Sequence, residues 1–247
     1  MHTISLPQEP KYTELSPSHG KIEILECYPG YGTTLGNAIR RVLLSSLEGA
    51  AVTSVKIKGV THEFTTMPGV MEDMVQIILN LKQVRFRMES EEPMTISLKS
   101  KGEGKVTAGD FKVSTGLEIV NPDQVIATLS DKKAEIDMEV EVARGIGYIP
   151  VEQQEREKEI GTIAIDAIYT PVKRVNFEVE NMRVGKRTDY DKITIEIMTD
   201  GSIAPDGAFN KAVDILMSQF SALASKEVAA PEKIEKVTKK KAAKKSE

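Results

Sequence analysis

Apolar and charged residues alternate in KIEILE, residues 21–26, as in a strand with one buried face. The pattern then changes to helical spacing, with one continuous apolar stripe that predicts an amphipathic helix. We expect Thr33 or Thr34 to cap the start of this helix and Gly49 to end it. The stripe consists of Leu35, Ala38, Ile39, Val42, Leu43 and Leu47.

A second helix is predicted over residues 69–82. Ile77 and Leu81 widen its apolar surface, so we expect it to be buried on more than one side. One side of it would carry Met71, Met74, Val75, Ile78 and Leu79.

Strand patterns dominate residues 86–142 and return after residue 161. TISL (95–98) alternates, and EIDMEVEVA (135–143) alternates strictly. RGIGYIPVEQQEREKEIG (144–161) is glycine-rich and then highly charged, which predicts a long exposed loop. The apolar faces of the two clearest strands consist of Ile136, Met138, Val140 and Val142, and of Ile193, Ile195 and Ile197.

A last helix is predicted to start near Pro205, because proline suits the first helical position. Residues 226–247 contain eight Lys and four Glu, a composition that predicts disorder. From these patterns we expect a soluble α+β scaffold with amphipathic helices near both ends. The apolar face of the last helix consists of Ala208, Ala212, Ile215, Leu216, Phe220 and Leu223.

Composition narrows the possible classes of protein. The 247 residues carry a net charge of −4, which argues against a general nucleic-acid binder but leaves a local basic patch possible. Cys27 is the only cysteine, and the three histidines are far apart, so we expect no disulfide, metal or cofactor. We also expect a cytoplasmic protein, since the sequence shows neither a signal peptide nor an apolar run long enough to span a bilayer.

GYGTTLGNAIRR (30–41) raises two alternatives, a phosphate-binding loop or a glycine turn leading into a core helix. The glycine spacing misses the dinucleotide fingerprint by one residue, and neither this segment nor GKRT (185–188) fits a P-loop, so the turn is favoured. Asn37 and Arg41 share one helix face, with Arg40 about 100° away. These polar residues form either a solvated face or a recognition face.

Catalytic motifs are poor. The carboxylates of DKKAEIDMEVE (131–141) lie on the outer face of an alternating strand, which solvation of that face explains. No compact Asp-x-Asp-x-Asp motif appears, so we expect no metal-dependent nucleotidyl transfer within this chain and no catalytic residue.

Several long segments resemble one known family, the N-terminal domain of the bacterial RNA polymerase α subunit. The resemblance runs from about Lys21 to Leu223. The segments are GYGTTLGNAIRRVLLSSLEGAAVTSVKIKGVTHEFTTMPGVMEDMVQIILNLK, LEIVNPDQVIA, ARGIGYIP, AIYTPVKRVNFEVE and RVGKRTDYDKITIEI.

The resemblance implies a two-domain α+β architecture. Residues 1–50 and 172–225 would form a discontinuous dimerisation domain, residues 51–171 an inserted β-rich domain, and residues 226–247 a disordered tail. The homodimer would nucleate assembly of DNA-directed RNA polymerase, with one copy on the β subunit and the other on β′. The chain would then serve transcription as a non-catalytic subunit of a nucleotidyltransferase, in the cytoplasm and at the nucleoid.

The same resemblance implies site residues. The Leu-Gly-Asn-Ala-x-Arg-Arg helix would face β, through Asn37, Arg40, Arg41 and Leu44. The β′-facing surface would include Lys82, Tyr169, Pro171 and Val172. The homodimer interface would consist of Leu35, Ile39, Val42, Leu43, Leu216, Phe220 and Leu223.

The Lys-rich end departs from the family pattern. Family members usually continue through a linker into a small helical domain that binds promoter DNA and activators, so the resemblance does not carry those contacts to this chain. An alternative function is therefore a DNA-binding module that acts through the tail, with salt-dependent affinity that is lost when the tail is deleted.

Overall fold

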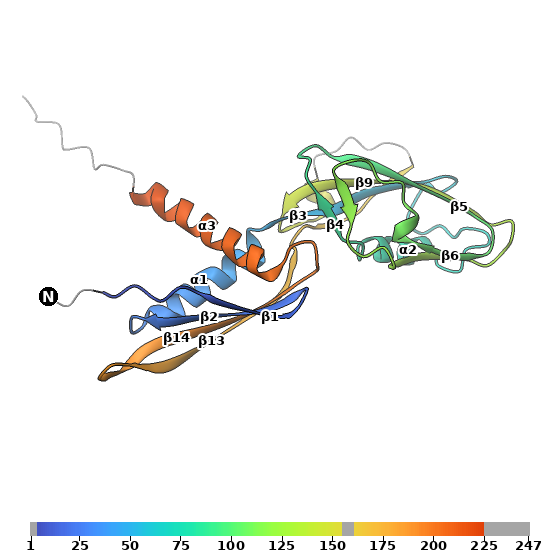
Figure 1. The fold of residues 1–247 in the computed structure, drawn as a ribbon. Helices are drawn as coiled ribbons and strands as arrows, with labels where there is room; N and C mark the ends of the chain where they lie inside the picture. The colour runs from blue at the N-terminus through green and yellow to red at the C-terminus, as the bar shows by residue number, and fades with distance from the viewer. Residues whose placement is uncertain (1–3, 155–160, 225–247) are drawn as a thin grey trace, which may run out of the picture.

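The fold is α+β, and strands make up most of it (Figure 1). The structure, a computed structural model, describes residues 4–154 and 161–224. Within these residues the buried hydrophobic side chains form two large clusters, each associated with its own sheet.

The first sheet joins strands from both ends of the chain. Its order is β1-β2-β14-β13, and all neighbours are antiparallel. Helices α1 (Tyr31–Ser45) and α3 (Pro205–Ala224) lie over one face of it (Figure 1). We call this sheet with its two helices the terminal unit. The strands are β1 (Lys11–Ser16), β2 (His19–Cys27), β13 (Val172–Val184) and β14 (Arg187–Thr199).

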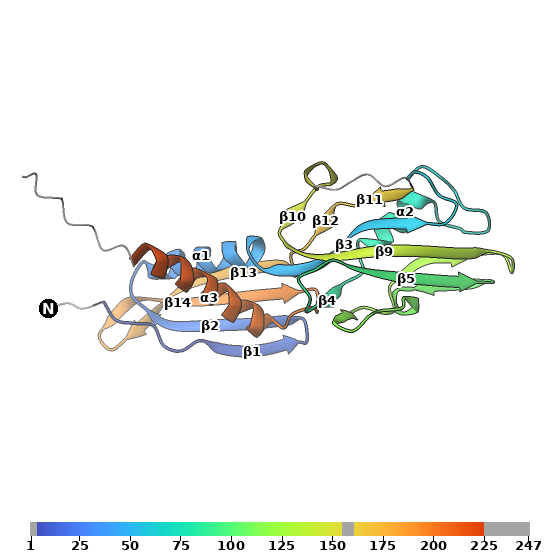
Figure 2. The same cartoon turned by 90° about the horizontal axis from the view of Figure 1, so that it is seen from above.

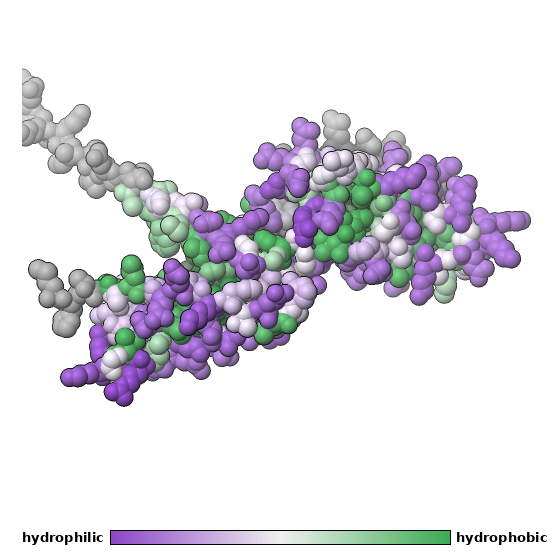
Figure 3. Space-filling model, viewed as in Figure 1, coloured by the Kyte–Doolittle hydropathy of each residue, from purple (hydrophilic) through white to green (hydrophobic). Residues whose placement is uncertain are grey.

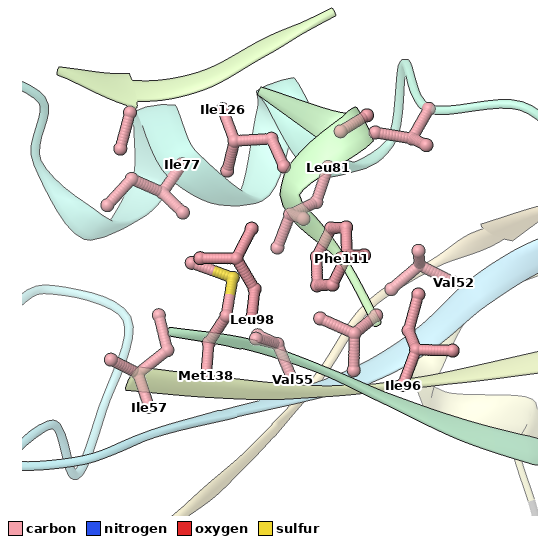
Figure 4. Packing of buried hydrophobic residues seen from close by; sticks show 14 of the residues in the cluster. Val52, Val55, Ile57, Ile77, Leu81, Ile96, Leu98, Phe111, Ile126 and Met138 are labelled. Carbon is pink, nitrogen blue, oxygen red and sulfur yellow. The ribbon is translucent and has the colours of Figure 1, made fainter. Parts of the chain in front are cut away.

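The second sheet has the order β5-β9-β3-β4-β7, with β11 paired to β3, and Figure 2 shows β3, β9 and β5 side by side. Helix α2 (Met74–Leu81) packs against this unit's apolar core, which Figure 4 shows at close range. We call it the central unit. Its strands are β3 (Glu48–Ile57), β4 (Phe86–Met88), β5 (Met94–Lys101), β7 (Leu117–Ile119), β9 (Glu135–Ile146) and β11 (Thr162–Ala164). Two small ribbons pair β6 (Gly104–Thr107) with β8 (Val125–Leu129) and β10 (Tyr148–Ile149) with β12 (Ala167–Ile168), and two 3-10 turns span Ala108–Asp110 and Val151–Gln153.

Strict alternation predicted the buried strands correctly. All four apolar residues predicted for the inner face of β9 are fully buried, as are the three isoleucines of β14. The helix predicted from Pro205 begins at that residue. The two strands follow the sequence because their alternating apolar residues all face a covered side of the sheet.

Several local predictions were wrong. Residues 144–154 are not an exposed loop, since β9 continues to Ile146 and is followed by β10 and a 3-10 turn. Helix α2 begins at Met74 rather than near residue 69, with Asp73 as its N-cap. Helix α1 begins at Tyr31, so neither Thr33 nor Thr34 caps it, and Gly49 lies inside β3. The exposed edge strand β1 was not predicted at all.

The boundaries proposed for the two domains stay a prediction, although the two clusters draw on the segments that those boundaries would require. The predicted disordered tail, residues 226–247, lies outside the described residues. Among the helices that are described, none is long and apolar enough to cross a membrane.

Candidate subunit-binding surfaces

Helix α1 has two distinct faces. Its inner face is buried against the terminal sheet through Gly32, Gly36, Ile39 and Leu43. A Cβ added at Gly36 would lie 2.6 Å from the Phe177 ring on β13, so only glycine permits this approach of helix and strand. The glycines therefore explain how closely α1 lies on its sheet.

We expect Gly36→Val to destabilise the terminal unit by about 1–3 kcal/mol, the usual cost of forcing extra methyl groups into a packed site. Thermal unfolding of the variant would measure the loss. Asn37→Val is the matched control, because it places the same side chain on the exposed face of the same helix. Equal stability of the two variants would contradict the close packing of α1 on β13.

The outer face of α1 carries the residues that the sequence assigned to β. Asn37, Arg40, Arg41 and Leu44 are all exposed. Each arginine is three or four positions from both Asn37 and Leu44, so the four residues form one continuous surface. Within residues 4–154 and 161–224, neither guanidinium pairs with a carboxylate. Two arginines on a well-anchored helix thus present their donors outward.

The start of α1 does not have the form of a phosphate site. The backbone N–H groups of Gly30 and Gly32 both donate to Oδ2 of Asp191, at 3.0 and 2.9 Å. A carboxylate of the same chain occupies the place where a phosphate oxygen would bind. This contact supports the turn-and-helix interpretation of the glycines.

The apolar stripe of α3 is buried at one end of the helix and exposed at the other. Ala208 and Ala212 are fully buried and Leu216 is half-buried, whereas Phe220 and Leu223 are 63% and 77% exposed. Figure 1 shows why, because α3 rises away from its own sheet toward its C-terminal end. Figure 3 shows pale green, apolar surface on that end of the helix. Large apolar side chains thus gather, exposed, at the uncovered end of α3, which makes it a candidate interaction surface.

Two residues predicted for the homodimer interface lie in the chain's own core. Ile39 is 6% exposed and Leu43 is fully buried, so their side chains contact the sheet below α1 and leave little surface for a second copy. Leu35 and Val42 are half-buried against the same core. A groove of about 600 Å³ runs between the end of α1 and the middle of α3, and its apolar lining includes Val42, Leu47, Ile146, Ile215 and Leu216.

Lys82, assigned to β′, is engaged in an ion pair within the central unit. Its Nζ donates to Oδ2 of Asp166 at 3.0 Å, and Oδ1 of Asp166 accepts from the backbone N–H of Val151 at 3.1 Å. These two hydrogen bonds hold the pKa of the Asp166 carboxyl below its usual value, and the bond from Lys82 has the larger effect. Lys82 thus ties the end of α2 to the segment before β12.

The other three β′ candidates are buried. Tyr169 is 6% exposed and Val172 4%, and Pro171 is buried as well. Tyr169 fills the space beside two glycines, since a Cβ at Gly145 would lie 2.7 Å from its ring and one at Gly49 only 1.8 Å from its carbonyl oxygen. Their buried side chains would shape a binding surface through the backbone rather than by direct contact.

The sequence-based prediction for α2 assigned two exposed residues to an apolar, buried side of the helix. The buried positions are Met74, Ile77 and Leu81, whereas Val75 and Leu79 are 39% and 52% exposed. Nearly every position of this short helix is apolar, so periodicity could not separate its faces. Met217, 61% exposed beside the end of the α3 stripe, was also missed.

The described residues contain no group of three His, Cys, Asp or Glu side chains that could hold a metal ion. Cys27 is fully buried, and burial is the main reason that the pKa of its thiol is raised, with Asp191 adding to the effect. A raised pKa keeps the thiol protonated, so it is a poor nucleophile.

Comparison with known families identifies the central unit. Residues 55–170, nearly all of the central unit, match the family model described as the RNA polymerase Rpb3/RpoA insert domain. The central unit thus belongs to a class of domain found inserted in polymerase subunits.

Relatives extend the match to most of the chain. The chain is 52% identical over 200 residues to the DNA-directed RNA polymerase subunit alpha of Symbiobacterium thermophilum, which covers 81% of this chain and 63% of that protein. The chain is 49% identical to the subunit of the same name from Moorella thermoacetica, over 83% of this chain and 66% of that protein. It is 44% identical to the subunit from Aquifex aeolicus, over 88% of this chain and 69% of that protein. The chain belongs to the family of bacterial DNA-directed RNA polymerase alpha subunits. It spans slightly less than two thirds of the length of the first two of these relatives.

Proposed function

We propose that this chain is the homodimeric scaffold on which a DNA-directed RNA polymerase assembles. In this proposal one copy binds the β subunit, the other copy binds β′, and the chain itself contributes no catalytic group to nucleotidyl transfer. As a part of the polymerase it would act in the cytoplasm, at the nucleoid. Membership of the alpha-subunit family supports the proposal, and the exposed faces of α1 and α3 supply the surfaces that it needs.

The observation that carries the proposal is the outer face of α1. Arginine is favoured at protein interfaces, because its planar fork binds carboxylates and carbonyls through paired hydrogen bonds. The inner face of α1 is closely packed on the sheet, so Arg40 and Arg41 project from a rigid support, which lowers the entropy that their ordering at an interface would cost.

The exposed end of α3 supports homodimer formation. Its stripe continues without a break from buried Ala212 through Leu216 to exposed Phe220. A second copy could cover that end through an isologous contact, in which the same surface of each copy is used. We therefore propose that the dimer contact consists of Leu216, Met217, Phe220 and Leu223, with Leu35 and Val42 beside them and with Ile39 and Leu43 beneath.

The β′ contact is proposed near Lys82 and Asp166 of the central unit. Exposed apolar residues lie on the neighbouring elements, Val75 and Leu79 on α2 and Ile168 on β12. Such a surface, apolar with a partly buried ion pair, has the mixed character of subunit interfaces.

We expect Lys82→Ala to leave the homodimer and its complex with β intact, and to weaken β′ recruitment by about tenfold, equivalent to about 1.4 kcal/mol. The loss of a charge-assisted bond and the unpaired Asp166 carboxylate are the physical causes. Size-exclusion chromatography of the preformed complex with added β′ would measure the effect.

Lys99→Ala is the matched control, since Lys99 also forms an ion pair in the central unit, with Asp137 at 2.9 Å. Asp166→Asn separates two roles of Lys82. A loss of β′ binding in both Lys82→Ala and Asp166→Asn would indicate that the ion pair shapes the surface, whereas a loss in Lys82→Ala alone would indicate direct contact. Normal recruitment of β′ by Lys82→Ala would remove Lys82 from the proposed interface.

The alternative of a DNA-binding module rests on the Lys-rich tail, which lies outside the described residues. No observation on the described residues favours it over the scaffold. A pull-down of recombinant β by this chain is the experiment that tests the proposed function, and failure to retain β would contradict it.

A further inference from the structure

Helix α1 begins without a capping side chain of its own. Its N-cap position is Gly30, whose backbone is left-handed with φ 83°, and no side chain of that residue can accept a hydrogen bond. Helices normally satisfy their first free N–H groups with a Ser, Thr, Asp or Asn at this position. The helix that carries the proposed β-facing surface therefore needs an acceptor from elsewhere in the chain.

Asp191 on β14 supplies that acceptor. Its Oδ2 accepts from both Gly30 N and Gly32 N, across more than 150 residues of sequence. Asp191 is 7% exposed, and a Cβ at Gly32 would lie 2.8 Å from its Cβ, so the helix and the carboxylate are in close contact. A negative charge at this end also interacts favourably with the helix dipole.

A bulge between β2 and β14 brings Asp191 to this place. Ile24 pairs with Ile193, whereas Cys27 pairs with Asp191, so β2 has one residue more than β14 over this interval. The bulged segment of β2 contains Glu26, whose backbone is left-handed with φ 57°. The bulge returns Cys27 to the buried face of β2, where it faces the same side as Asp191.

Aromatic contacts enclose the same end of the helix. The Tyr28 ring lies edge-on to both Tyr31 and Tyr190, with centroids 6.0 and 6.2 Å apart. The Arg187 guanidinium lies over Tyr28 and Tyr190, at 5.7 and 5.2 Å from the ring centroids. Residues of β14 are thus linked to the start of α1 in two ways, directly through Asp191 and indirectly through the Tyr28 ring.

We infer that Asp191 is a positioning residue for subunit binding, which fixes the first turn of α1 and thereby the direction of its β-facing surface. The inference rests on the proposed function of that surface. Asn37 lies less than two turns beyond the capped residues, so fraying of the first turn reaches the first member of the surface. Ile39 and Leu43 anchor the rest of the helix in the core, so the fold survives the loss of the cap.

The experiment compares Asp191→Ala, Asp191→Asn and the control Glu196→Ala, each in the full chain. Glu196 is on the same strand, but it is exposed and lies five residues from the contact with α1. Hydrogen exchange of the amides of residues 30–35 and affinity for the purified β subunit are the two readouts, both at a temperature where every variant is a folded dimer.

In Asp191→Ala we expect these amides to exchange about tenfold faster, as the loss of an N-cap would produce. Affinity for β should fall by up to about tenfold, in proportion to the fall in the fraction of chains whose first turn is closed, because only those chains are competent to bind. Asp191→Asn should keep most of the protection of these amides and most of the affinity for β, since its amide oxygen can still accept from the two N–H groups. Glu196→Ala should match the wild-type chain.

Unchanged exchange or unchanged affinity in Asp191→Ala would overturn the inference. Loss of the folded dimer in this variant would overturn it as well, because Asp191 would then be required for the fold rather than for the position of α1. Arg41→Ala, measured in parallel, separates this failure from that of the proposed function. If Arg41→Ala also binds β normally, the proposed surface itself is wrong, whereas weak binding by Arg41→Ala with normal binding by Asp191→Ala rejects the positioning role alone.

Discussion

Arg41→Ala is expected to form a normal homodimer that binds the β subunit at least about 30-fold more weakly than the wild-type chain. Truncation of a charge that is buried and paired in a complex typically costs roughly 2–5 kcal/mol, equivalent to about 30-fold to several thousand-fold in affinity. The side chain of Arg41 is exposed on the outer face of α1, so its removal takes nothing from the core. Size-exclusion chromatography of each variant alone, and then with β, would show both parts of the result.

Two further variants sharpen this experiment. Arg41→Lys keeps the charge but not the planar fork, so we expect it to bind β weakly too if paired hydrogen bonds are made. Arg183→Ala removes an exposed arginine from β13 of the same unit and should bind normally. An Arg41→Ala variant that binds β with normal affinity, or that cannot dimerise, would show that the assigned role is wrong.

The double variant Phe220→Glu/Leu223→Glu is expected to be a monomer at micromolar concentration. Both side chains extend the apolar stripe of α3 beyond the part covered by its own sheet. Loss of two central apolar contacts, at about 2 kcal/mol or more each, would lower the association constant by about a thousandfold, and the buried charges would add to this. Sedimentation equilibrium would measure the change.

Ser218→Glu is the matched control, since Ser218 is exposed on another side of the same helix. It should remain a dimer. Far-ultraviolet circular dichroism would verify that the double variant keeps its helices. A dimer of unchanged affinity in the double variant would show that the second copy does not bind at the end of α3.

Strands and helices whose signals lie within a short segment could be predicted from the sequence. The alternation of β9 and β14 and the proline at the start of α3 are signals contained in short segments, and the structure confirms them. Membership of the alpha-subunit family, which several long sequence segments predicted, is confirmed by relatives that match most of the chain.

What the sequence could not show depended on contacts between distant segments. The cap of α1 comes from Asp191, more than 150 residues away, so the nearby threonines gave a misleading local signal. The stripe of α1 showed which residues are apolar but not whether the sheet or a second copy covers them, and the structure buries Leu43 in its own chain. Tyr169 was assigned to a surface but packs beside two glycines from β3 and β9.

The mass of the complex formed by this chain with purified β tests the central claim most directly. The scaffold account predicts that the chain alone has the mass of two copies, and that saturating β adds one β subunit to the pair. Light scattering coupled to size-exclusion chromatography would resolve both species. A monomeric chain, or a dimer that does not take up β, would contradict the account.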